Sequence, residues 1–351
     1  MTGGSTSMRA AVCRKHGDYR DLIVEDLPRP VPGPREILID VAASGVSFAN
    51  ILAIAGRHQN RSDPPFIPGT EVAGIVRACG EGVDHLRPGD RVVAAVRNGG
   101  FAEGVCSPDT TVFKIPTVLP FDEAVLFPTI YGTAYAALTW YARLQAGETV
   151  LVHGSGGATG LAAVEIARSL GARVIATASS PEKRATALRH GASVAIDYTR
   201  DGFRDQVLDL TGGRGADVIF DPVGGAVLSE SMRCIAPEGR LLPIGFAGGD
   251  IPQIPASLIL VKNIAVLGVY WGYHFGWAKV PPKPGNTERV RTLFTELFDL
   301  YERGALRPTI QRRLPITEFA AALALIEERQ VIGKVVLDCS PGDELSNSGL
   351  P

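Results

Sequence analysis

The sequence predicts an α/β protein in two parts, a doubly wound parallel sheet and a smaller, mostly β domain. The first observation is the stretch from Glu148 to Asp197, whose pattern is strand, glycine turn, helix, strand, helix and strand. The second is that strand and helix patterns keep alternating after Asp197. The third is residues 8–120, in which short β patterns lie between Gly and Pro turns. A chain of 351 residues is long enough for two domains with separate cores.

The composition argues against several classes of partner. The net charge of −2 gives no support for binding to nucleic acid or to an acidic lipid surface. No apolar run reaches the roughly 18–20 residues that a membrane-crossing helix needs. Five scattered cysteines without a CxxC pair are typical of reduced thiols, so we expect a cytoplasmic protein. From the net charge and the short apolar runs we expect no nucleic-acid or membrane partner. The N-terminal MTGGSTS lacks the features of a signal peptide, and residues 1–7 and 341–351 are expected to be disordered tails.

The first domain, residues 8–128, is expected to be mostly antiparallel β structure. Four segments have strand patterns bounded by Gly or Pro: MRAAVCRKHG, PVPGPREILIDVAASGV, GTEVAGIVRACG and GDRVVAAV. Residues 121–144 then have a helical pattern with a break near Pro128. This helical segment leads into the second domain, residues 129–277.

The second domain opens on a glycine turn that is typical of a nucleotide site. The apolar run Val150, Leu151 and Val152 suits a strand buried on both faces. The turn that follows has glycines at 154, 157 and 160, a spacing that departs from a strict GxGxxG because Thr159 takes the last position. Such a turn lets the backbone of the next helix approach an anion with its free N–H groups. We expect a dinucleotide pyrophosphate there, bound by Ser155, Gly157, Ala158 and Thr159.

The end of the next strand, residues 173–178, favours NADPH over NADH. An NAD site needs a carboxylate there for the ribose 2′-hydroxyl, and no Asp or Glu occurs between Ile166 and Pro181. Ser179 and Ser180 stand there instead, followed by Lys183 and Arg184, and hydroxyls with a cation suit a 2′-phosphate. A purely structural interpretation makes Ser180 a helix cap, Pro181 the first helical residue and Lys183 a solvated charge. Both interpretations can hold together.

The rest of the chain continues the alternation and then returns to the first domain. After Asp197 the patterns are a helix near 203–210 and the segments ADVIFDPVGG, AVLSESMRCIA, GRLLPIGFAGG and NIAVLGVYWG, which bring the parallel sheet to about six strands. Asp221 is expected to order the DPVGG turn. A turn rich in Pro and Gly at 280–285 precedes a long helix, a strand, another helix and the strand GKVVLDCS. We infer that residues 278–340 complete the first domain.

Motifs along nearly the whole chain, from Met8 to about Asp338, resemble the medium-chain dehydrogenase/reductase superfamily. They are ASGVSFAN, IPGTEVAGIV, RPGDRVVA, TAYAAL, VHGSGGATG, ATASSPEK, DVIFDPVGG, GRLLPIGFAGG and GKVVL. The nearer match is its zinc-free branch, the NADPH:quinone oxidoreductases related to zeta-crystallin. The resemblance implies a GroES-like N-terminal domain, a Rossmann domain, a cleft between them, and a homodimer made by edge-to-edge pairing of the last Rossmann strands. The segment 265–270 is the candidate for that pairing.

The resemblance also implies roles for individual residues. Ser179, Lys183 and Tyr198 match positions near the 2′-phosphate, with Arg329 as a further candidate. Thr133 and Phe246 would lie near the nicotinamide. Asn50 and Tyr131 would face the substrate and take part in catalysis, with Phe48 and Trp271 lining that space. Each has a structural alternative: Tyr131 could cap the domain interface, Asn50 could satisfy a turn, and the aromatic cluster of residues 271–277 could pack at a domain or subunit boundary.

No metal site is expected, because zinc-dependent relatives carry Cys and His where this chain has Ser47 and Thr70. Neither hydroxyl is a normal zinc ligand, and the six histidines show no paired ligand spacing. Hydride acceptors that delocalise the arriving charge, such as quinones and α,β-unsaturated carbonyls, then need no Lewis acid. We therefore expect reduction of such a small-molecule electrophile by NADPH, with solvent as the proton source. Two alternatives stay open, an enoyl-thioester reductase and a non-catalytic NADPH-binding sensor or structural protein.

Overall fold

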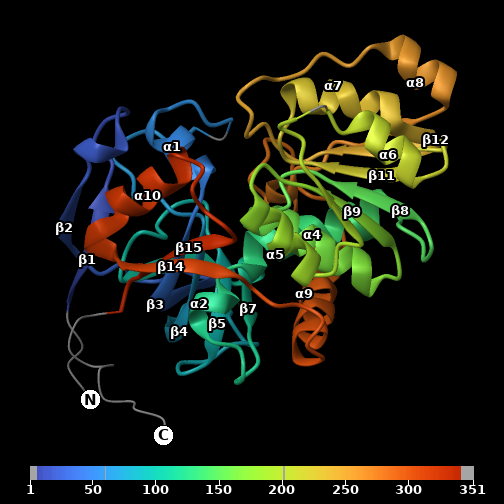
Figure 1. The fold of residues 1–351 in the computed structure, drawn as a ribbon. Coiled ribbons are helices and arrows are strands. Elements are labelled where there is room, and N and C mark those ends of the chain that lie inside the picture. The colour runs from blue at the N-terminus through green and yellow to red at the C-terminus, as the bar shows by residue number, and fades with distance from the viewer. Residues whose placement is uncertain (1–5, 60, 201, 341–351) are drawn as a thin grey trace, which may run out of the picture. The chain divides into compact units, whose positions relative to one another are not determined.

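The chain folds into two compact units. The computed structural model describes residues 6–59, 61–200 and 202–340 (Figure 1). The first unit comprises Met1–Thr129, Gly272–Phe294 and Ile310–Pro351, and the second comprises Ile130–Trp271 and Thr295–Thr309. The chain therefore crosses between the units after Thr129, Trp271, Phe294 and Thr309.

These units differ from the expected boundaries at the C-terminal side. Residues 272–277 lie with the first unit, and residues 295–309 lie with the second rather than with the β domain. The reason is a set of long-range hydrogen bonds inside the second unit. Tyr135 donates to Glu296 at 2.7 Å, and the Arg307 N–H donates to Glu165 at 3.0 Å. Such contacts between distant residues leave no local pattern in the sequence.

The N-terminal boundary also differs from the expectation. Ser7 already belongs to the first strand, and the Thr6 carbonyl accepts a hydrogen bond from Arg29 N at 2.9 Å. Residues 6 and 7 are therefore part of the fold rather than of a tail. The remaining parts of the two predicted tails, residues 1–5 and 341–351, lie outside the described residues.

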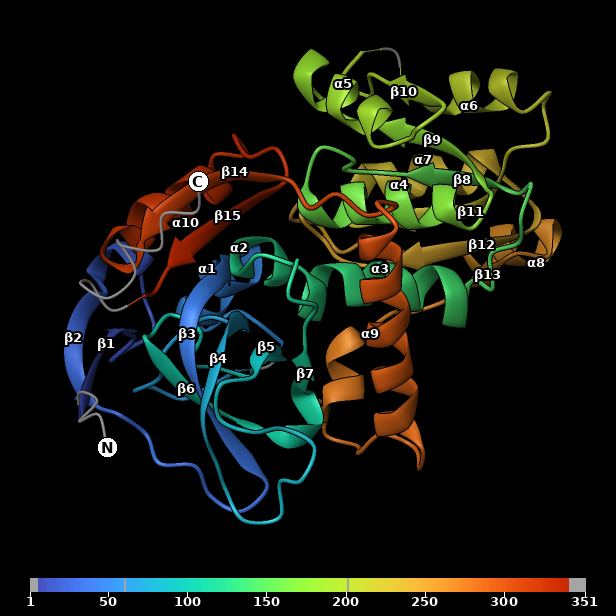
Figure 2. The ribbon, with the colours of Figure 1, turned by 90° about the horizontal axis from the view of Figure 1, so that it is seen from below.

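The first unit is built on a seven-stranded sheet with a two-stranded sheet beside it. The larger sheet has the order β14-β15-β3-β4-β5-β7, with β6 paired to β3, and β1 pairs with β2. Figure 2 shows β14 and β15, from the end of the chain, next to β3 from its beginning. Its strands are β1 (Ser7–Val12), β2 (Ile23–Pro28), β3 (Glu36–Val46), β4 (Glu71–Cys79), β5 (Arg91–Ala95), β6 (Gly104–Pro108), β7 (Val112–Lys114), β14 (Ile310–Pro315) and β15 (Lys334–Asp338). Its helices and short helical turns are η1 (Tyr19–Asp21), α1 (Phe48–Ile54), η2 (Asp109–Thr111), α2 (Phe121–Ala124), η6 (Ile316–Glu318) and α10 (Phe319–Glu327).

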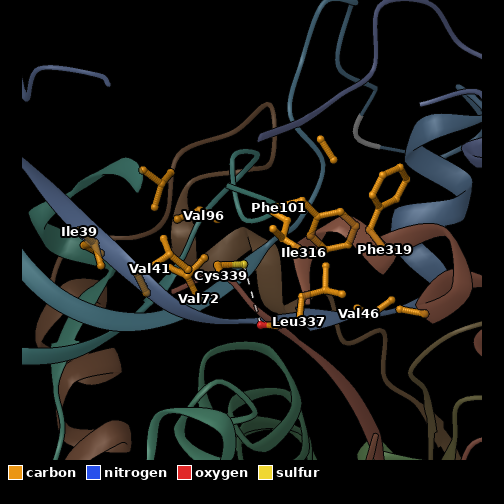
Figure 3. Close-up of a cluster of buried hydrophobic side chains, with 14 of the residues drawn as sticks. Ile39, Val41, Val46, Val72, Val96, Phe101, Ile316, Phe319, Leu337 and Cys339 are labelled. Atoms are coloured by element: carbon orange, nitrogen blue, oxygen red, sulfur yellow. Dashed lines mark hydrogen bonds between the residues drawn. The ribbon is translucent and has the colours of Figure 1, made fainter. Parts of the chain in front are cut away.

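Alternating residues of β3 form the centre of the core of this unit. Ile37, Ile39 and Val41 are each at most 1% exposed, as the two-residue period of a strand predicts. Figure 3 shows side chains from β3, β4 and β15 gathered with Phe101, Ile316 and others in this core. Contacts between α10 and both β14 and β15 bring the C-terminal segment into the same core. The segment 310–340 therefore completes the first unit.

The second unit is a six-stranded parallel sheet in the order β10-β9-β8-β11-β12-β13. Numbered within the unit this is 3-2-1-4-5-6, the doubly wound order expected from the sequence. Figure 1 shows α4 and α5 on one side of the sheet and α6 and α7 on the other. The strands are β8 (Thr149–Val152), β9 (Arg173–Thr177), β10 (Val194–Ile196), β11 (Ala216–Asp221), β12 (Ile235–Pro243) and β13 (Ala265–Val266). The helices are α3 (Gly132–Ala136), the π-helical η4 (Ala137–Tyr141), α4 (Ala158–Ser169), α5 (Pro181–Arg189), α6 (Arg204–Leu210), α7 (Gly225–Cys234) and α8 (Ala256–Lys262).

Three helical segments contain crossings between the units: the π-helical η3 (Phe127–Tyr131), η5 (Trp271–Phe275) and α9 (Asn286–Glu302). The break expected near Pro128 corresponds to η3, which separates α2 from α3. In α9 the buried residues Val290, Leu293, Phe294, Leu297 and Phe298 follow the helical period. No helix among the described parts of the chain is both long and apolar enough to span a bilayer.

The edge of the parallel sheet is shorter than the sequence suggested. The segment NIAVLGVYWG, residues 263–272, predicted a strand, but only Ala265–Val266 pair with β12. The helix α8 just before it was not expected, because its exposed Leu260 and Val261 break an amphipathic pattern. β13 is nevertheless the edge strand, as the predicted pairing between subunits requires.

Candidate functional site

The glycine turn joins β8 to α4 at the carboxyl edge of the parallel sheet. Gly154 has a left-handed backbone with φ of +59°, which few other residues adopt. At Gly160 a Cβ would collide with the Gly154 carbonyl oxygen and lie 2.7 Å from Ser155 Cα. Both glycines are therefore required by the protein itself, because the turn would not close with side chains there.

Gly157 is different, because nothing in the protein demands a glycine there. Its φ of −88° and ψ of 162° suit any residue, and the nearest atom to a Cβ would be the Gly154 oxygen at 3.6 Å. The missing side chain leaves the outer face of the turn bare. Gly157 caps α4 without a side-chain hydrogen bond, so the capping residue itself places no side chain at the start of the helix. This bare helix start is the feature that an anion requires.

The structure also shows which backbone groups of the turn already have a partner. The Gly157 N–H donates to the Gly154 carbonyl at 3.0 Å, and its predicted role as a pyrophosphate donor stays a prediction. Leu161 N makes the first bond of the helix, to Gly157 O at 2.9 Å. The N–H groups of Ala158 and Thr159, in the first turn of α4, are therefore the candidates for a phosphate.

Ser155 lies in the turn with its side chain directed into the protein. The residue is fully buried, and both its N–H and its hydroxyl donate to the Thr177 carbonyl, at 3.1 and 2.9 Å. Ser155 therefore fixes the glycine turn to the end of β9. Its expected contact with the cofactor would be through the backbone around it.

Lys183 lies beside the same turn. A Cβ at Gly156 would be 2.7 Å from Lys183 Cβ, so the stem of this lysine crosses directly over the glycine. Ser180 Oγ accepts from Lys183 N at 3.2 Å and caps α5, with Pro181 as the first helical residue, which confirms these two parts of the structural interpretation. Lys183 is half-buried, not a fully solvated charge. Ser179, between β9 and that cap, is exposed. The fold therefore brings a lysine and a hydroxyl to the edge where α4 begins.

Two further predicted cofactor residues occupy other strand ends of the second unit. Tyr198 follows β10, is half-buried and packs on the core of this unit. Phe246 follows β12 and is 40% exposed, and a Cβ at Gly224 would lie 2.8 Å from its ring. Phe246 therefore lies next to the turn after β11. The ends of β8, β9 and β11 are also joined at this edge, where ligands of doubly wound sheets bind.

Asp221 orders the turn after β11, as expected. Its Oδ1 accepts from Val223 N at 2.7 Å and from Gly224 N at 3.0 Å. Burial raises the pKa of this carboxyl, and the two backbone donors oppose that shift. A Cβ at Gly154 would touch Pro222 and Val223, so the Asp221 turn also supports the glycine turn.

A buried histidine under the glycine turn was missed by sequence reasoning. His153 is fully buried, with Nδ1 2.9 Å from Thr177 Oγ1 and Nε2 2.8 Å from Ser231 Oγ. Ser231 donates its own proton to Val227 O, so His153 carries its proton on Nε2 and accepts from Thr177. Burial lowers the pKa of His153 to about 3, so the ring is neutral. It links β8, β9 and α7, and the only sequence signal was a polar residue ending an apolar strand.

The two predicted catalytic residues both use their polar groups inside the protein. Tyr131 is 2% exposed, and its hydroxyl donates to Glu165 Oε2 at 2.7 Å. Asn50 is 1% exposed, and its Oδ1 accepts from Ser47 N at 2.7 Å and from Ser47 Oγ at 3.0 Å. Asn50 thus closes the first turn of α1, which is the structural alternative considered for it. Their participation in catalysis stays a prediction.

The aromatic residues 271–277 are shared between the two units, and their predicted place at the substrate or at a boundary stays a prediction. Trp271 is 5% exposed and belongs to the second unit, where it packs over Gly132 and against Trp140 with ring centroids 5.7 Å apart. Phe275 belongs to the first unit, where its centroid lies 6.5 Å from that of Phe113. The boundary between the units falls directly after Trp271.

The remaining predicted residues lie at three places. Thr133 is half-buried on α3, directly after Tyr131 and Gly132. Phe48 opens α1 and is 38% exposed. Arg329 follows α10 in the first unit, exposed and with a left-handed φ of 56°. Their proposed contacts with cofactor or substrate stay predictions.

The first unit also contains a buried ion pair next to the position that departs from the zinc-dependent pattern. Glu71, directly after Thr70, is 1% exposed and pairs with Lys334, which is 4% exposed. Thr129 donates a hydrogen bond to the other Glu71 oxygen. Burial raises the pKa of Glu71, and the charge of Lys334 opposes that shift. Among the residues that the structure describes, no three His, Cys, Asp or Glu side chains are grouped to hold a metal ion.

Comparisons with known proteins agree with this architecture. The family described as alcohol dehydrogenase GroES-like domain matches residues 33–117, and the family described as zinc-binding dehydrogenase matches residues 158–282. The quinone oxidoreductase-like protein 2 homolog of Nematostella vectensis is 39% identical over 95% of this chain and 90% of its own length.

Two solved structures are similar over the whole fold. A mycobacterial protein complexed with NADPH is 30% identical, with a TM-score of 0.83 over 94% of this chain and 99% of that one. Escherichia coli quinone oxidoreductase complexed with NADPH is 25% identical, with a TM-score of 0.83 over 95% of this chain and 100% of that one. The chain therefore belongs to the medium-chain dehydrogenase/reductase superfamily, in the zinc-free branch that contains the quinone oxidoreductases.

Proposed function

We propose that this protein is an NADPH-dependent oxidoreductase whose acceptor is a quinone or an α,β-unsaturated carbonyl. The observation that carries the proposal is the position of Lys183 across Gly156, beside the bare start of α4. A cation and the exposed Ser179 at this edge suit a 2′-phosphate, which a carboxylate would repel. Two similar proteins solved with NADPH support the same choice.

The residues of the second unit have the chemistry that this cofactor needs. The bare face at Gly157 gives the pyrophosphate close access to the N–H groups of Ala158 and Thr159. Phe246, exposed at the end of β12, offers an apolar surface to the nicotinamide. When bound, NADPH supplies the hydride, and the protein contributes binding, orientation and exclusion of water.

The choice of acceptor rests on Ser47 and Thr70, because neither hydroxyl provides the ligand that a catalytic zinc would need. A conjugated acceptor spreads the arriving charge over its own π-system and does not depend on a Lewis acid. Tyr131 donates its proton to Glu165, and Ser47 donates its hydroxyl proton to Asn50. We therefore expect solvent to protonate the reduced acceptor.

The test is steady-state oxidation of NADPH, and of NADH as a control, with 1,4-benzoquinone, 9,10-phenanthrenequinone, 2-alkenals and crotonyl-CoA. We expect turnover with a quinone or enone and a strong preference for NADPH. Faster turnover of crotonyl-CoA than of every quinone and alkenal would support the enoyl-thioester alternative. Tight NADPH binding without turnover of any acceptor would reject the enzymatic proposal in favour of a binding protein.

A further inference from the structure

A buried carboxylate in the second unit accepts three hydrogen bonds that the proposed chemistry does not use. Glu165 lies on α4 and its side chain is 2% exposed. Oε2 accepts from Tyr131 Oη at 2.7 Å, and Oε1 accepts from His190 Nδ1 at 2.7 Å and from Arg307 N at 3.0 Å. A carboxylate on the buried, otherwise apolar face of a helix is costly unless its oxygens are satisfied in this way.

Two of the three donors lie close to where the chain enters or leaves the second unit. Tyr131 is the second residue after the chain first enters the second unit, and Arg307 lies two residues before Thr309, where the chain last leaves it. Thr309 itself joins the group, because its Oγ1 lies 3.0 Å from His190 Nε2. Glu165, directly and through His190, therefore binds both the segment where the chain first enters the second unit and the segment where it last leaves it.

The proton positions in this group are mutually consistent. Because Glu165 only accepts, His190 carries a proton on Nδ1. In the neutral ring Nε2 is then an acceptor, and Thr309 supplies the hydroxyl proton. Thr309, His190, Glu165 and Tyr131 form a continuous chain of hydrogen bonds inside the second unit. We call these four residues the Glu165 clamp.

The clamp is attached to the same helix that the cofactor would contact. Glu165 follows Ala158, at the start of α4, by seven residues, or about 10 Å along the helix axis. Tyr131 directly precedes α3, which carries Thr133, the residue assigned to the nicotinamide side by resemblance. A rigid helix thus connects the bare phosphate-facing turn with the segment that would contact the reacting ring.

We propose that Glu165 is a positioning residue for hydride transfer, which acts through Tyr131 and through the Arg307–Thr309 segment. It fixes Tyr131 and the Arg307–Thr309 segment relative to α4. The nicotinamide then keeps a constant position relative to these segments. The inference rests on the function proposed above. A displacement of about 1 Å at the reacting centre can lower a rate by 10²-fold, so loosening the clamp should slow the chemical step.

Glu165→Gln tests the proposal, because it keeps the shape of the side chain and one acceptor oxygen but replaces the other with a donor. Glu148→Gln is the matched control. Glu148 is also a carboxylate of the second unit with three donors: Arg240 Nη1 at 2.9 Å, Arg240 Nη2 at 2.6 Å and Gln145 N at 2.8 Å. Its described hydrogen-bond donors, Arg240 and Gln145, are not clamp residues, so Glu148→Gln controls for the loss of an equivalent network.

For Glu165→Gln we expect kcat to fall at least 10-fold while the NADPH dissociation constant changes less than about 2-fold. The primary isotope effect with deuterated NADPH should rise, because hydride transfer becomes more rate-limiting. Glu148→Gln should keep kcat within about 2-fold of the wild type. Equal kcat values for the two variants, or a loss of NADPH affinity that accounts for the whole effect, would overturn the proposal.

Hydrogen exchange tests the clamp without depending on which acceptor the enzyme reduces. In the wild-type protein with NADPH, the Arg307 amide should be protected, and Glu165→Gln should speed its exchange at least 10-fold while Glu148→Gln does not. Equal exchange in the two variants would overturn the clamp even if the enzyme is active.

If no acceptor is turned over by the wild type, the proposed function fails, and positioning for hydride transfer fails with it. If Glu165→Gln does not fold, Thr309→Val removes only the outer link, and a kcat equal to that of the wild type would then count against the clamp.

Discussion

The sharpest prediction concerns two glycines of one turn that should behave in opposite ways. Gly157→Ala adds a methyl group where the nearest protein atom is 3.6 Å away, so the folded protein accommodates it. Gly160→Ala places the same methyl group against the Gly154 carbonyl and 2.7 Å from Ser155 Cα. Both clashing atoms belong to the backbone and cannot move without opening the turn.

The magnitudes follow from these contacts. Gly157→Ala should cost at most roughly 1 kcal/mol of stability, the difference between Gly and Ala as a helix cap. The methyl group would occupy the space through which the pyrophosphate approaches, and losing one charge-assisted hydrogen bond costs about 1.5–3 kcal/mol. NADPH affinity should therefore fall about 10- to 100-fold. Gly160→Ala should cost about 1–3 kcal/mol or more through overpacking, in addition to any effect on binding.

Thermal denaturation and titration of NADPH fluorescence measure the two effects separately. We expect Gly157→Ala to melt within a few degrees of the wild type and to bind NADPH poorly, and Gly160→Ala to melt clearly lower. The reasoning is refuted if Gly157→Ala binds NADPH as tightly as the wild type. It is also refuted if Gly160→Ala is as stable as Gly157→Ala, because the steric contrast would then have no consequence.

Four further predictions address charge, pH and assembly. His153 has a pKa of about 3 in the fold against 6.5 in the unfolded chain, so the unfolded state takes up a proton first as the pH falls. The contribution to the free energy of unfolding is therefore complete above about pH 6.5 and falls by up to roughly 4 kcal/mol as the pH drops toward 3. Urea unfolding should show that His153→Phe loses less stability in acid than the wild type. Lys183→Ala should weaken NADPH by about 10-fold or more and leave NADH nearly unchanged, as measured by fluorescence titration; equal losses for both would contradict the 2′-phosphate assignment. Lys334→Met leaves the buried Glu71 carboxylate without its cation and should cost about 3–5 kcal/mol in thermal unfolding, most of which a second change, Glu71→Leu, should restore. We also propose a homodimer that pairs through β13, and light scattering should detect a dimer that Val266→Pro disrupts; a monomeric wild type would reject it.

Local patterns predicted a large part of this structure correctly. The apolar run 150–152, the glycines that follow and the helix after them predicted β8, the turn and α4, because each signal lies within a few residues of its effect. Ser180 as a cap and Asp221 as the organiser of a turn were also predicted, since both act on backbone groups two or three residues away. Strand and helix alternation was sufficient to predict the doubly wound order.

The same patterns misjudged features that depend on distant partners. The segment 263–272 has the pattern of a strand, but only Ala265 and Val266 pair with β12. The Gly157 N–H, expected at the pyrophosphate, closes the turn by donating to the Gly154 carbonyl.

By itself, the sequence determined the fold class, the position of the dinucleotide turn and the chemistry of the residues that surround it, since these follow from period, glycine spacing and residue type over short distances. Only the tertiary structure decided that Glu165 joins residues 131, 190 and 307, that His153 is neutral between two hydroxyls, and that 295–309 returns to the second unit. The physical reason is that a hydrogen bond between residues 24 to 142 positions apart depends on how the chain folds back on itself. No local periodicity encodes that distance.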